Sequence, residues 1–155
     1  MSQRIPVLYE KKPCYDIYIT KGFQELENEL SDLVEKCRKV CIITDSIVGP
    51  LYAEAVKSSI SNIASKVCVF TLPAGEENKT LDNVKSAYEF LIREGFQRKD
   101  LLIALGGGVI GDMTGFIAAT YLRGVDYVQI PTTLLSQNDS SIGGKTGVDF
   151  DGYKN

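Results

Sequence analysis

The sequence contains no histidine in its 155 residues. Histidine is the usual acid–base group near neutral pH and a common metal ligand in proteins. A chain without histidine rarely carries a complete metalloenzyme site, so we expect no metal site among these residues.

Cysteine is scarce as well, and its placement does not favour a metal site. The chain has Cys14, Cys37, Cys41 and Cys68. Cys37 falls at the end of a predicted helix and Cys41 at the start of a predicted strand, and no histidine is available to complete a mixed zinc site. We therefore interpret the cysteines as small buried hydrophobic residues.

The sequence also lacks a long apolar run and an excess of charge of either sign. No stretch is long enough to span a bilayer, and residues 1–12 have no apolar run typical of a signal peptide. Seventeen basic and 20 acidic residues give a formal net charge of −3, which predicts no general attraction to nucleic acid or to anionic membranes. We expect a cytoplasmic protein in which phosphate binding depends on local geometry.

What the sequence does contain is the core of one domain, since hydrophobic residues make up 44% of it. Short apolar segments alternate with amphipathic ones, which predicts a Rossmann-like α/β fold: a doubly wound, mainly parallel sheet with helices on both faces. Residues 15–19 fit either this sheet or an N-terminal hairpin. The predicted strands are 15–19, 40–44, 67–72, 101–105 and 125–130, and the predicted helices are 23–37, 48–61, 81–94, 109–122 and one opening over 133–139.

A glycine-rich turn, with Gly107 and Gly108 at its centre, follows the predicted strand 101–105. Glycines let the backbone approach a ligand closely, and the N-terminus of the next helix favours a phosphate. The turn is not the usual dinucleotide fingerprint, because it follows a late strand and Asp126 opens the next strand instead of closing it. We favour phosphate binding here over a tight turn without a ligand. Asp112 belongs either to this site or only to compensation of the helix dipole.

Residues 139–147 form a second unusual string, Asp-Ser-Ser-Ile-Gly-Gly-Lys-Thr-Gly. It is not a P-loop, because Asp139 stands where the first glycine of that motif is required, five residues before Gly144. A carboxylate, three hydroxyls and the ammonium of Lys145 within nine residues suit a polyhydroxylated, anionic small molecule. The alternative is a flexible turn with a solvated lysine.

Further polar residues follow the inner strands. Asp45 closes the strand 40–44, where it would bind a ribose hydroxyl pair or cap the next helix, and the two interpretations stand equal. Glu76 and Lys79 follow the strand 67–72, in a segment that is also explained as a turn with a helix cap at Thr80 or Asn78.

Two more candidates flank the last predicted strand. Thr132 and Thr133 present hydroxyls after it, and Arg123 ends the helix 109–122, where its side chain suits either a phosphate or the helix-end carbonyls. Because ligands of open parallel sheets bind beyond the carboxyl ends of the strands, we expect most of these candidates in one crevice.

Taken together, these strings resemble the 3-dehydroquinate synthase family, and they occur in its order and at its spacing. The resemblance is close in the second half of the chain and rests mainly on Asp45 in the first half. The matching segments are residues 73–80, 106–112, 119–124, 129–135 and 139–147.

The resemblance implies a phosphate-eliminating carbon–oxygen lyase of the shikimate pathway. Such an enzyme converts 3-deoxy-D-arabino-heptulosonate 7-phosphate into 3-dehydroquinate and phosphate, with transient use of NAD and with a divalent metal, zinc or cobalt. A ring hydroxyl is oxidised, phosphate is eliminated, the ketone is reduced and the opened ring closes by an aldol step. The oxidation acidifies the neighbouring C–H bond, which makes the elimination possible.

The resemblance also implies a role for each candidate residue. The residues that would hold NAD are Asp45, Glu76, Lys79, Gly107, Gly108, Asp112, Thr132, Thr133 and Lys154. The residues that would bind the sugar phosphate are Asp139, Lys145, Asn155 and Arg123, the last of them in the neighbouring subunit of a homodimer.

Two positions depart from the family pattern: Asp149 stands where asparagine is more frequent, and Tyr153 where glycine usually precedes Lys-Asn. The family's metal ligands, one glutamate and two histidines, come from a following helical domain. We therefore expect residues 1–155 to be an N-terminal dinucleotide-binding domain of a longer chain, without metal and without turnover of its own.

Three other interpretations stay open. Another sugar-phosphate cyclase would share the NAD site but convert a different sugar phosphate. A polyol dehydrogenase of the glycerol dehydrogenase type has a related glycine turn, but it would leave residues 139–147 unexplained and would consume NAD. A stand-alone nucleotide-binding module would account directly for the missing histidines.

Overall fold

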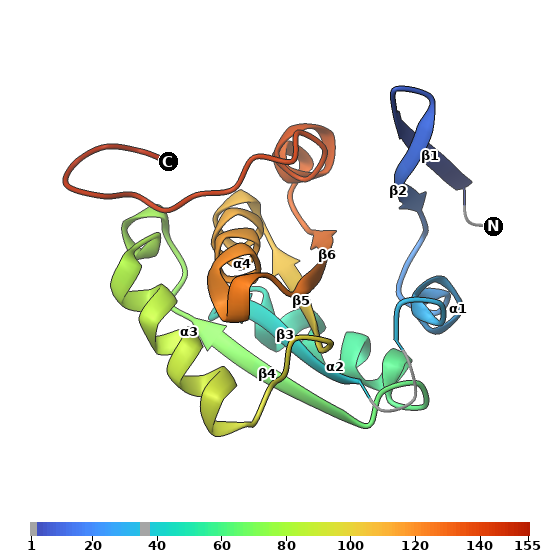
Figure 1. Ribbon diagram of the computed structural model, residues 1–155, viewed down its shortest axis with the longest axis horizontal. Helices are drawn as coiled ribbons and strands as arrows, with labels where there is room; N and C mark the ends of the chain where they lie inside the picture. The colour runs from blue at the N-terminus through green and yellow to red at the C-terminus, as the bar shows by residue number, and fades with distance from the viewer. Residues whose placement is uncertain (1–2, 35–37) are drawn as a thin grey trace.

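The computed structural model of the protein describes residues 3–34 and 38–155. Its centre is a parallel sheet with the strand order β4-β3-β5-β6, and a separate antiparallel hairpin of β1 and β2 lies beside it (Figure 1). This arrangement confirms the predicted α/β fold. The strands are β1 (Gln3–Tyr9), β2 (Lys12–Ile19), β3 (Lys39–Asp45), β4 (Lys66–Leu72), β5 (Leu101–Gly106) and β6 (Asp126–Pro131), and the helices are α1 (Leu26–Leu30), α2 (Gly49–Ile60), α3 (Leu81–Arg93) and α4 (Gly108–Thr120).

Helices cover both faces of the sheet because its inner strands carry apolar side chains on both sides. In β3, Val40 and Ile42 belong to the hydrophobic cluster formed with α1 and α2, whereas Cys41 and Ile43 belong to the cluster formed with α3 and α4. Every residue of β5 is buried. The sheet is therefore doubly wound, as predicted.

The strand order reverses the direction of winding between β3 and β5. From β3 the chain runs to β4 on one side and then returns to β5 on the other side of β3. In sheets of this kind ligands bind beyond the carboxyl ends of the strands at the point of reversal. Here those ends are Asp45 in β3 and Gly106 in β5.

Between β3 and β6 the predicted elements agree with the structure to within two residues at each end. The helix predicted over residues 23–37 is wrong in length, because α1 covers only Leu26–Leu30. The Ser31 hydroxyl donates to the Asn28 carbonyl at 2.8 Å, a local bond through which serine competes with regular helix. The interpretation of Cys37 as a helix end falls outside the described residues.

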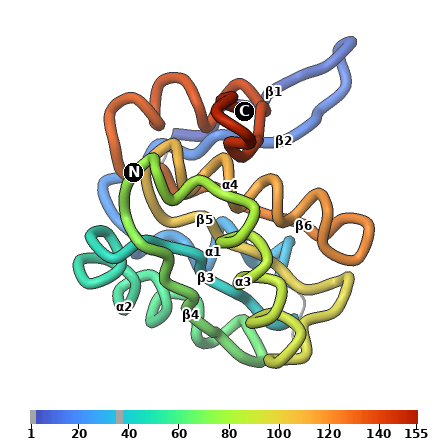
Figure 2. Tube along the Cα trace, turned by 90° about the vertical axis from the view of Figure 1, so that its left-hand side faces the viewer, coloured from blue at the N-terminus to red at the C-terminus, as the bar shows by residue number. Residues whose placement is uncertain are grey.

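The N-terminal hairpin settles the alternatives for residues 15–19, which pair with β1 and not with the central sheet. β1 was not predicted as a strand; it contains Pro6, which lacks an N–H for pairing. The hairpin lies at the same end of the molecule as the C-terminal segment (Figures 1 and 2). The Tyr15 hydroxyl donates to the Ile142 carbonyl at 2.9 Å and joins the two.

The cysteine prediction holds in part. Cys41 is buried and Cys68 is half-buried against the cluster of α3 and α4, but Cys14 is exposed on the hairpin. Within residues 3–34 and 38–155, no helix has the length and apolar character needed to cross a membrane.

Candidate functional site

A pocket of about 350 Å³ lies at the reversal of winding, beyond the carboxyl ends of β3, β4 and β5. Its walls come from turns that are far apart in the sequence, which is the convergence expected of a ligand site in a doubly wound sheet. The residues that line it include Asp45, Ala74, Gly75, Gly107, Gly108 and Thr133.

Bare backbone forms one wall of this pocket at the start of α4. Gly107 has φ −77° and ψ −167°, an extended conformation open to any residue, so any need for glycine here comes from the space around it and not from the backbone. A Cβ on Gly107 would lie 3.1 Å from Cγ2 of Thr133, and one on Gly108 would lie 3.2 Å from Oγ of Ser140. Because α4 begins at Gly108, the positive end of its dipole reaches the same place, and the turn can accept a phosphate at close range.

Asp45 supports the turn before α2 and lies at the pocket. Its Oδ1 accepts hydrogen bonds from the backbone N–H groups of Ile47 and Val48, both at 2.8 Å, so it holds the turn that leads into α2. The N-cap position of α2 is Val48, which has no side-chain cap, so the prediction of Asp45 as the cap itself is wrong. Asp45 also lines the pocket. Its contact with a ribose stays a prediction.

Lys79 is buried, with 3% of its side chain exposed. Its Nζ lies 2.6 Å from Oδ2 of Asp112 and also donates to Oδ1 of Asn155. A buried ammonium needs such partners, because removing a charge from water without them is costly. The network joins the turn before α3, the beginning of α4 and the C-terminal segment, and so brings together three predicted site residues.

The C-terminal segment is held on the same turn by further contacts. The Asp149 N–H donates to the Lys79 carbonyl at 2.8 Å, and Nζ of Lys154 lies 3.3 Å from Oε1 of Glu76. The Lys154–Glu76 pair is exposed and contributes little to stability. It does bring together two residues that were predicted to contact the cofactor.

Thr132 and Thr133 follow β6 and differ in their surroundings. The Thr132 N–H donates to the Gly106 carbonyl at 2.9 Å, while its buried Oγ1 has no hydrogen-bond partner among the described residues. Oγ1 of Thr133 accepts a hydrogen bond from the Ser136 N–H at 3.2 Å and caps the turn that follows. Thr133 also lines the pocket.

The helix predicted to open over residues 133–139 is a short, wide turn, η3 (Ser136–Ser140). The Ser141 N–H donates to the Ser136 carbonyl at 3.1 Å, a five-residue span typical of π-type turns, which are frequent at functional sites. Its last residue, Ser140, was not singled out from the sequence. The Ser140 hydroxyl is buried beside Gly108 and lacks a partner within the described part of the chain. The sequence of residues 139–147 shows that hydroxyl groups are present, but it does not show that the Ser140 hydroxyl is the buried one.

Asp139 and Lys145 are both exposed. The Asp139 carbonyl accepts hydrogen bonds from the N–H groups of Ile142 and Gly143, at 3.0 and 3.1 Å, which fixes the backbone of this turn. Neither the Asp139 carboxylate nor the Lys145 ammonium has an ion pair or hydrogen bond within residues 3–34 and 38–155. Both groups are open to a ligand, and their contact with substrate stays a prediction.

Arg123 is one of the predicted site residues that do not line this pocket. It lies beyond the far end of α4, a helix of 13 residues that rises about 20 Å from Gly108. Leu122 and Arg123 have φ values of 50° and 71°, a left-handed conformation that is strained for both residue types. The role of Arg123 in a neighbouring subunit stays a prediction.

The described part of the chain does not form a metal site. In residues 3–34 and 38–155, no group of three or more His, Cys, Asp and Glu side chains is placed to hold a metal ion.

Comparison with known sequences gives a consistent match. Residues 69–155 match the protein family described as 3-dehydroquinate synthase N-terminal. A 3-dehydroquinate synthase from Streptococcus suis (strain 05ZYH33) is 50% identical over 141 residues, which cover 91% of this chain and 40% of that protein. The chain thus spans about 40% of the length of the curated relatives it matches.

Two solved structures share the whole arrangement. A 2-deoxy-scyllo-inosose synthase complexed with carbaglucose-6-phosphate, NAD+ and Co2+ matches with a TM-score of 0.83 and 26% identity, over 100% of this chain and 41% of that one. The 2-epi-5-epi-valiolone synthase from Streptomyces hygroscopicus subsp. jinggangensis 5008, with NAD+ and Zn2+ bound, matches with a TM-score of 0.78 and 29% identity, over 99% of this chain and 41% of that one.

Proposed function

This chain belongs to the 3-dehydroquinate synthase family, and from that premise we propose that it forms the NAD-binding side of a cytoplasmic enzyme with this activity. The enzyme converts 3-deoxy-D-arabino-heptulosonate 7-phosphate into 3-dehydroquinate and phosphate. The observation that carries the proposal is the pocket at the reversal of winding, where the Asp45 carboxylate and the bare backbone of Gly107 and Gly108 converge from separate strand ends.

The residues around this pocket fit NAD. A Cβ would fill the space at Gly107, and the N-terminus of α4 favours the pyrophosphate there. Asp45, Glu76 and Lys79 would hold the adenosine side, and Thr132 has an unused buried hydroxyl at the same edge of the sheet. When bound, NAD would supply reversible hydride acceptance at a ring carbon that bears a hydroxyl, so that the reaction has no net redox change.

The sugar phosphate would lie against residues 139–147. The Lys145 ammonium would neutralise anionic charge of the substrate, and the Asp139 carboxylate would accept hydrogen bonds from its hydroxyls. Asn155 would contact the substrate from the C-terminal segment. Because Asn155 is also bound to Lys79, its position depends on the cofactor side of the site.

We also propose that the enzyme is a homodimer in which Arg123 of one subunit reaches the substrate phosphate of the other. The support is the distance within one chain, since α4 separates Arg123 from the pocket along its whole length. The guanidinium fork suits a phosphate.

The divalent metal of the family does not fit the part of this chain that the structure describes, where no suitable cluster of ligands occurs. The two solved relatives bind Co2+ or Zn2+ in their complete chains.

Another sugar-phosphate cyclase is the second candidate, because the solved structures that match over the whole chain act as 2-deoxy-scyllo-inosose and 2-epi-5-epi-valiolone synthases. Sequence identity favours 3-dehydroquinate synthase activity, because the chain is 50% identical to a 3-dehydroquinate synthase and only 26% and 29% identical to these two cyclases. Competing assays with the substrates of all three enzymes would separate the candidates.

Two measurements test the proposal. NAD should raise the unfolding temperature of the chain. At a hundredfold excess over Kd, its binding adds about 2.7 kcal/mol to the free energy of unfolding. With the heptulosonate phosphate, the purified enzyme should release inorganic phosphate without accumulation of NADH. An unchanged unfolding temperature would rule out the NAD site, and steady accumulation of NADH would favour a dehydrogenase.

A further inference from the structure

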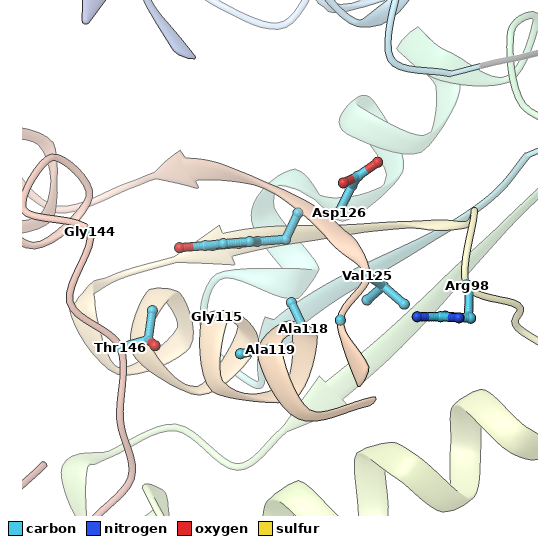
Figure 3. A pocket seen from close by; sticks show the side chains of 10 residues that line it. Arg98, Gly115, Ala118, Ala119, Val125, Asp126, Gly144 and Thr146 are labelled. Carbon is cyan, nitrogen blue, oxygen red and sulfur yellow. The ribbon is translucent and has the colours of Figure 1, made fainter. Parts of the chain in front are cut away.

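The string 139–147 crosses α4 at one point of close approach. A Cβ on Gly115 would lie 2.1 Å from Cγ2 of Thr146, 3.0 Å from Cβ of Thr146 and 3.2 Å from the Tyr127 hydroxyl. Figure 3 shows Thr146 beside α4 next to Gly115, at one end of a pocket of about 430 Å³ that extends toward Arg98. No real side chain reaches 2.1 Å, so any residue other than glycine at 115 must displace Thr146.

Helix geometry alone does not explain a glycine at this position. Gly115 lies in the middle of α4, away from both helix ends, and has no positive φ. A glycine in a helix interior costs about 0.5–1 kcal/mol relative to alanine. The close approach of Thr146 is the structural reason for glycine here.

The contact at Gly115 anchors the chain between two backbone hydrogen bonds, from the Gly143 N–H to the Asp139 carbonyl and from the Asp149 N–H to the Lys79 carbonyl. Gly143, Gly144 and Gly147 leave the backbone few conformational restraints, and the Lys145 side chain is exposed. Residues 147 and 148 are buried directly after Thr146. The packing of Thr146 on bare helix backbone therefore fixes the point from which the neighbouring Lys145 ammonium extends.

We propose that Gly115 is a positioning residue for the substrate: it seats Thr146 on α4 and thereby sets the place of the Lys145 ammonium, without contact to the NAD pocket. This inference rests on the proposed function, in which Lys145 binds the anionic sugar phosphate. It predicts that changes at Gly115 weaken substrate binding and leave NAD binding intact.

The test compares Gly115→Ala with wild type in two ways. Trypsin cleavage after Lys145 should become about five- to a hundredfold faster, since an overpacked contact populates the open loop and cleavage follows that population. Calorimetry should give an unchanged affinity for NAD and a weaker affinity for the heptulosonate phosphate in the presence of NAD. A purely structural role would lower both affinities together.

A second change should restore the loop. Thr146→Ala removes Cγ2, the atom at 2.1 Å, and the Thr146 hydroxyl makes no hydrogen bond within the described residues. Trypsin should therefore cleave the double variant Gly115→Ala/Thr146→Ala almost as slowly as wild type. Its affinity for the heptulosonate phosphate should also return toward the wild-type value. Ala119→Ser is the matched control, because it adds an atom to an exposed position one turn further along α4 and should behave as wild type.

Thr146→Phe enlarges the loop side of the contact with Gly115. It takes the place of Gly115→Ala in the test if that variant does not fold. Fast cleavage with intact NAD binding in either variant supports the inference. Wild-type cleavage rates in both variants, or no recovery in the double variant, overturn it. A wild-type chain without NAD affinity overturns the proposed function instead, while the cleavage rates still decide the role of Gly115.

Discussion

At the scale of single residues, Lys79 shows how a buried charge ties the proposed cofactor site to the fold. Its ammonium is buried against Asp112 at 2.6 Å, and the Asp112 side chain is 19% exposed. Removal of one partner of such a pair leaves the other charge uncompensated, which costs more than the pair itself contributes. The site residues are therefore also stability residues.

Lys79→Met should lower the free energy of unfolding by about 3 kcal/mol, because it leaves the Asp112 carboxylate unpaired. The free energy of unfolding should fall less in the double variant Lys79→Met/Asp112→Asn than in the single variant, since no uncompensated charge remains. Urea denaturation measures both. Lys85→Met is the control, as Lys85 is exposed and 3.9 Å from Glu89, and should change stability by less than about 0.5 kcal/mol. A double variant less stable than Lys79→Met would refute this explanation.

Gly107 permits a second test at this scale, because its conformation allows other residues while its surroundings do not. Gly107→Val should bind NAD at least about tenfold more weakly, a loss of about 1.4 kcal/mol, since the branched side chain enters the pocket beside Thr133. Gly107→Ala adds only Cβ and should have a smaller effect. Calorimetry with NAD gives both affinities, and equal affinities for all three proteins would place the cofactor elsewhere.

At the scale of elements, the contact between β4 and the end of α3 depends on pH. The hydrogen bond from Lys66, at 2.8 Å, holds the pKa of Glu94 below its ordinary value of 4.5. A carboxyl with a lower pKa in the folded state stabilises the fold above its unfolded pKa. That contribution is lost as the pH falls below about 4.5 and through the folded value.

The urea midpoint of wild type should therefore fall more steeply from pH 5 toward pH 3 than that of Lys66→Gln, and the difference should shrink at about 1 M salt. Lys57→Gln serves as the control, because its partner Glu54 is 4.0 Å away and mostly exposed. Parallel pH profiles for wild type and Lys66→Gln would show that the contact does not stabilise the fold.

The elements also show how far the sequence determines this structure. β5, the glycine turn and α4 were predicted within two residues, because a continuous apolar strand, three glycines and an apolar helix leave few alternatives. α1 was overestimated, since apolar periodicity over 23–34 does not reveal the Ser31 bond to Asn28. β1 was missed, since its residues are mostly exposed.

The site was predictable where it depends on strand ends, because the carboxyl ends of parallel strands share one edge of the sheet. It was not predictable where it depends on contacts across the fold. Lys79 and Asn155 are 76 residues apart in sequence, and their hydrogen bond follows from the path of the C-terminal segment over the turn before α3. The approach of Thr146 to Gly115 likewise appears only in three dimensions.

At the scale of the whole molecule, α4 separates the proposed substrate residues into two groups. Asp139 lies in η3 after β6, and Lys145 precedes Thr146, which packs against the middle of α4, whereas Arg123 lies beyond the far end of that helix. One chain therefore presents a crevice at one end and a guanidinium at the other. If both serve one substrate, each complete site uses two subunits.

Mixed dimers test this arrangement directly. Arg123→Ala and Lys145→Ala should each bind the heptulosonate phosphate weakly in the presence of NAD. When equal amounts are unfolded and refolded together, half of the dimers are hybrids with one intact site, so calorimetry should detect about a quarter of the wild-type sites at wild-type affinity. A mixture of Asp139→Ala and Lys145→Ala should restore none, because both residues belong to one crevice. No recovery in the first mixture, or a monomer in sedimentation, would place Arg123 outside the substrate site.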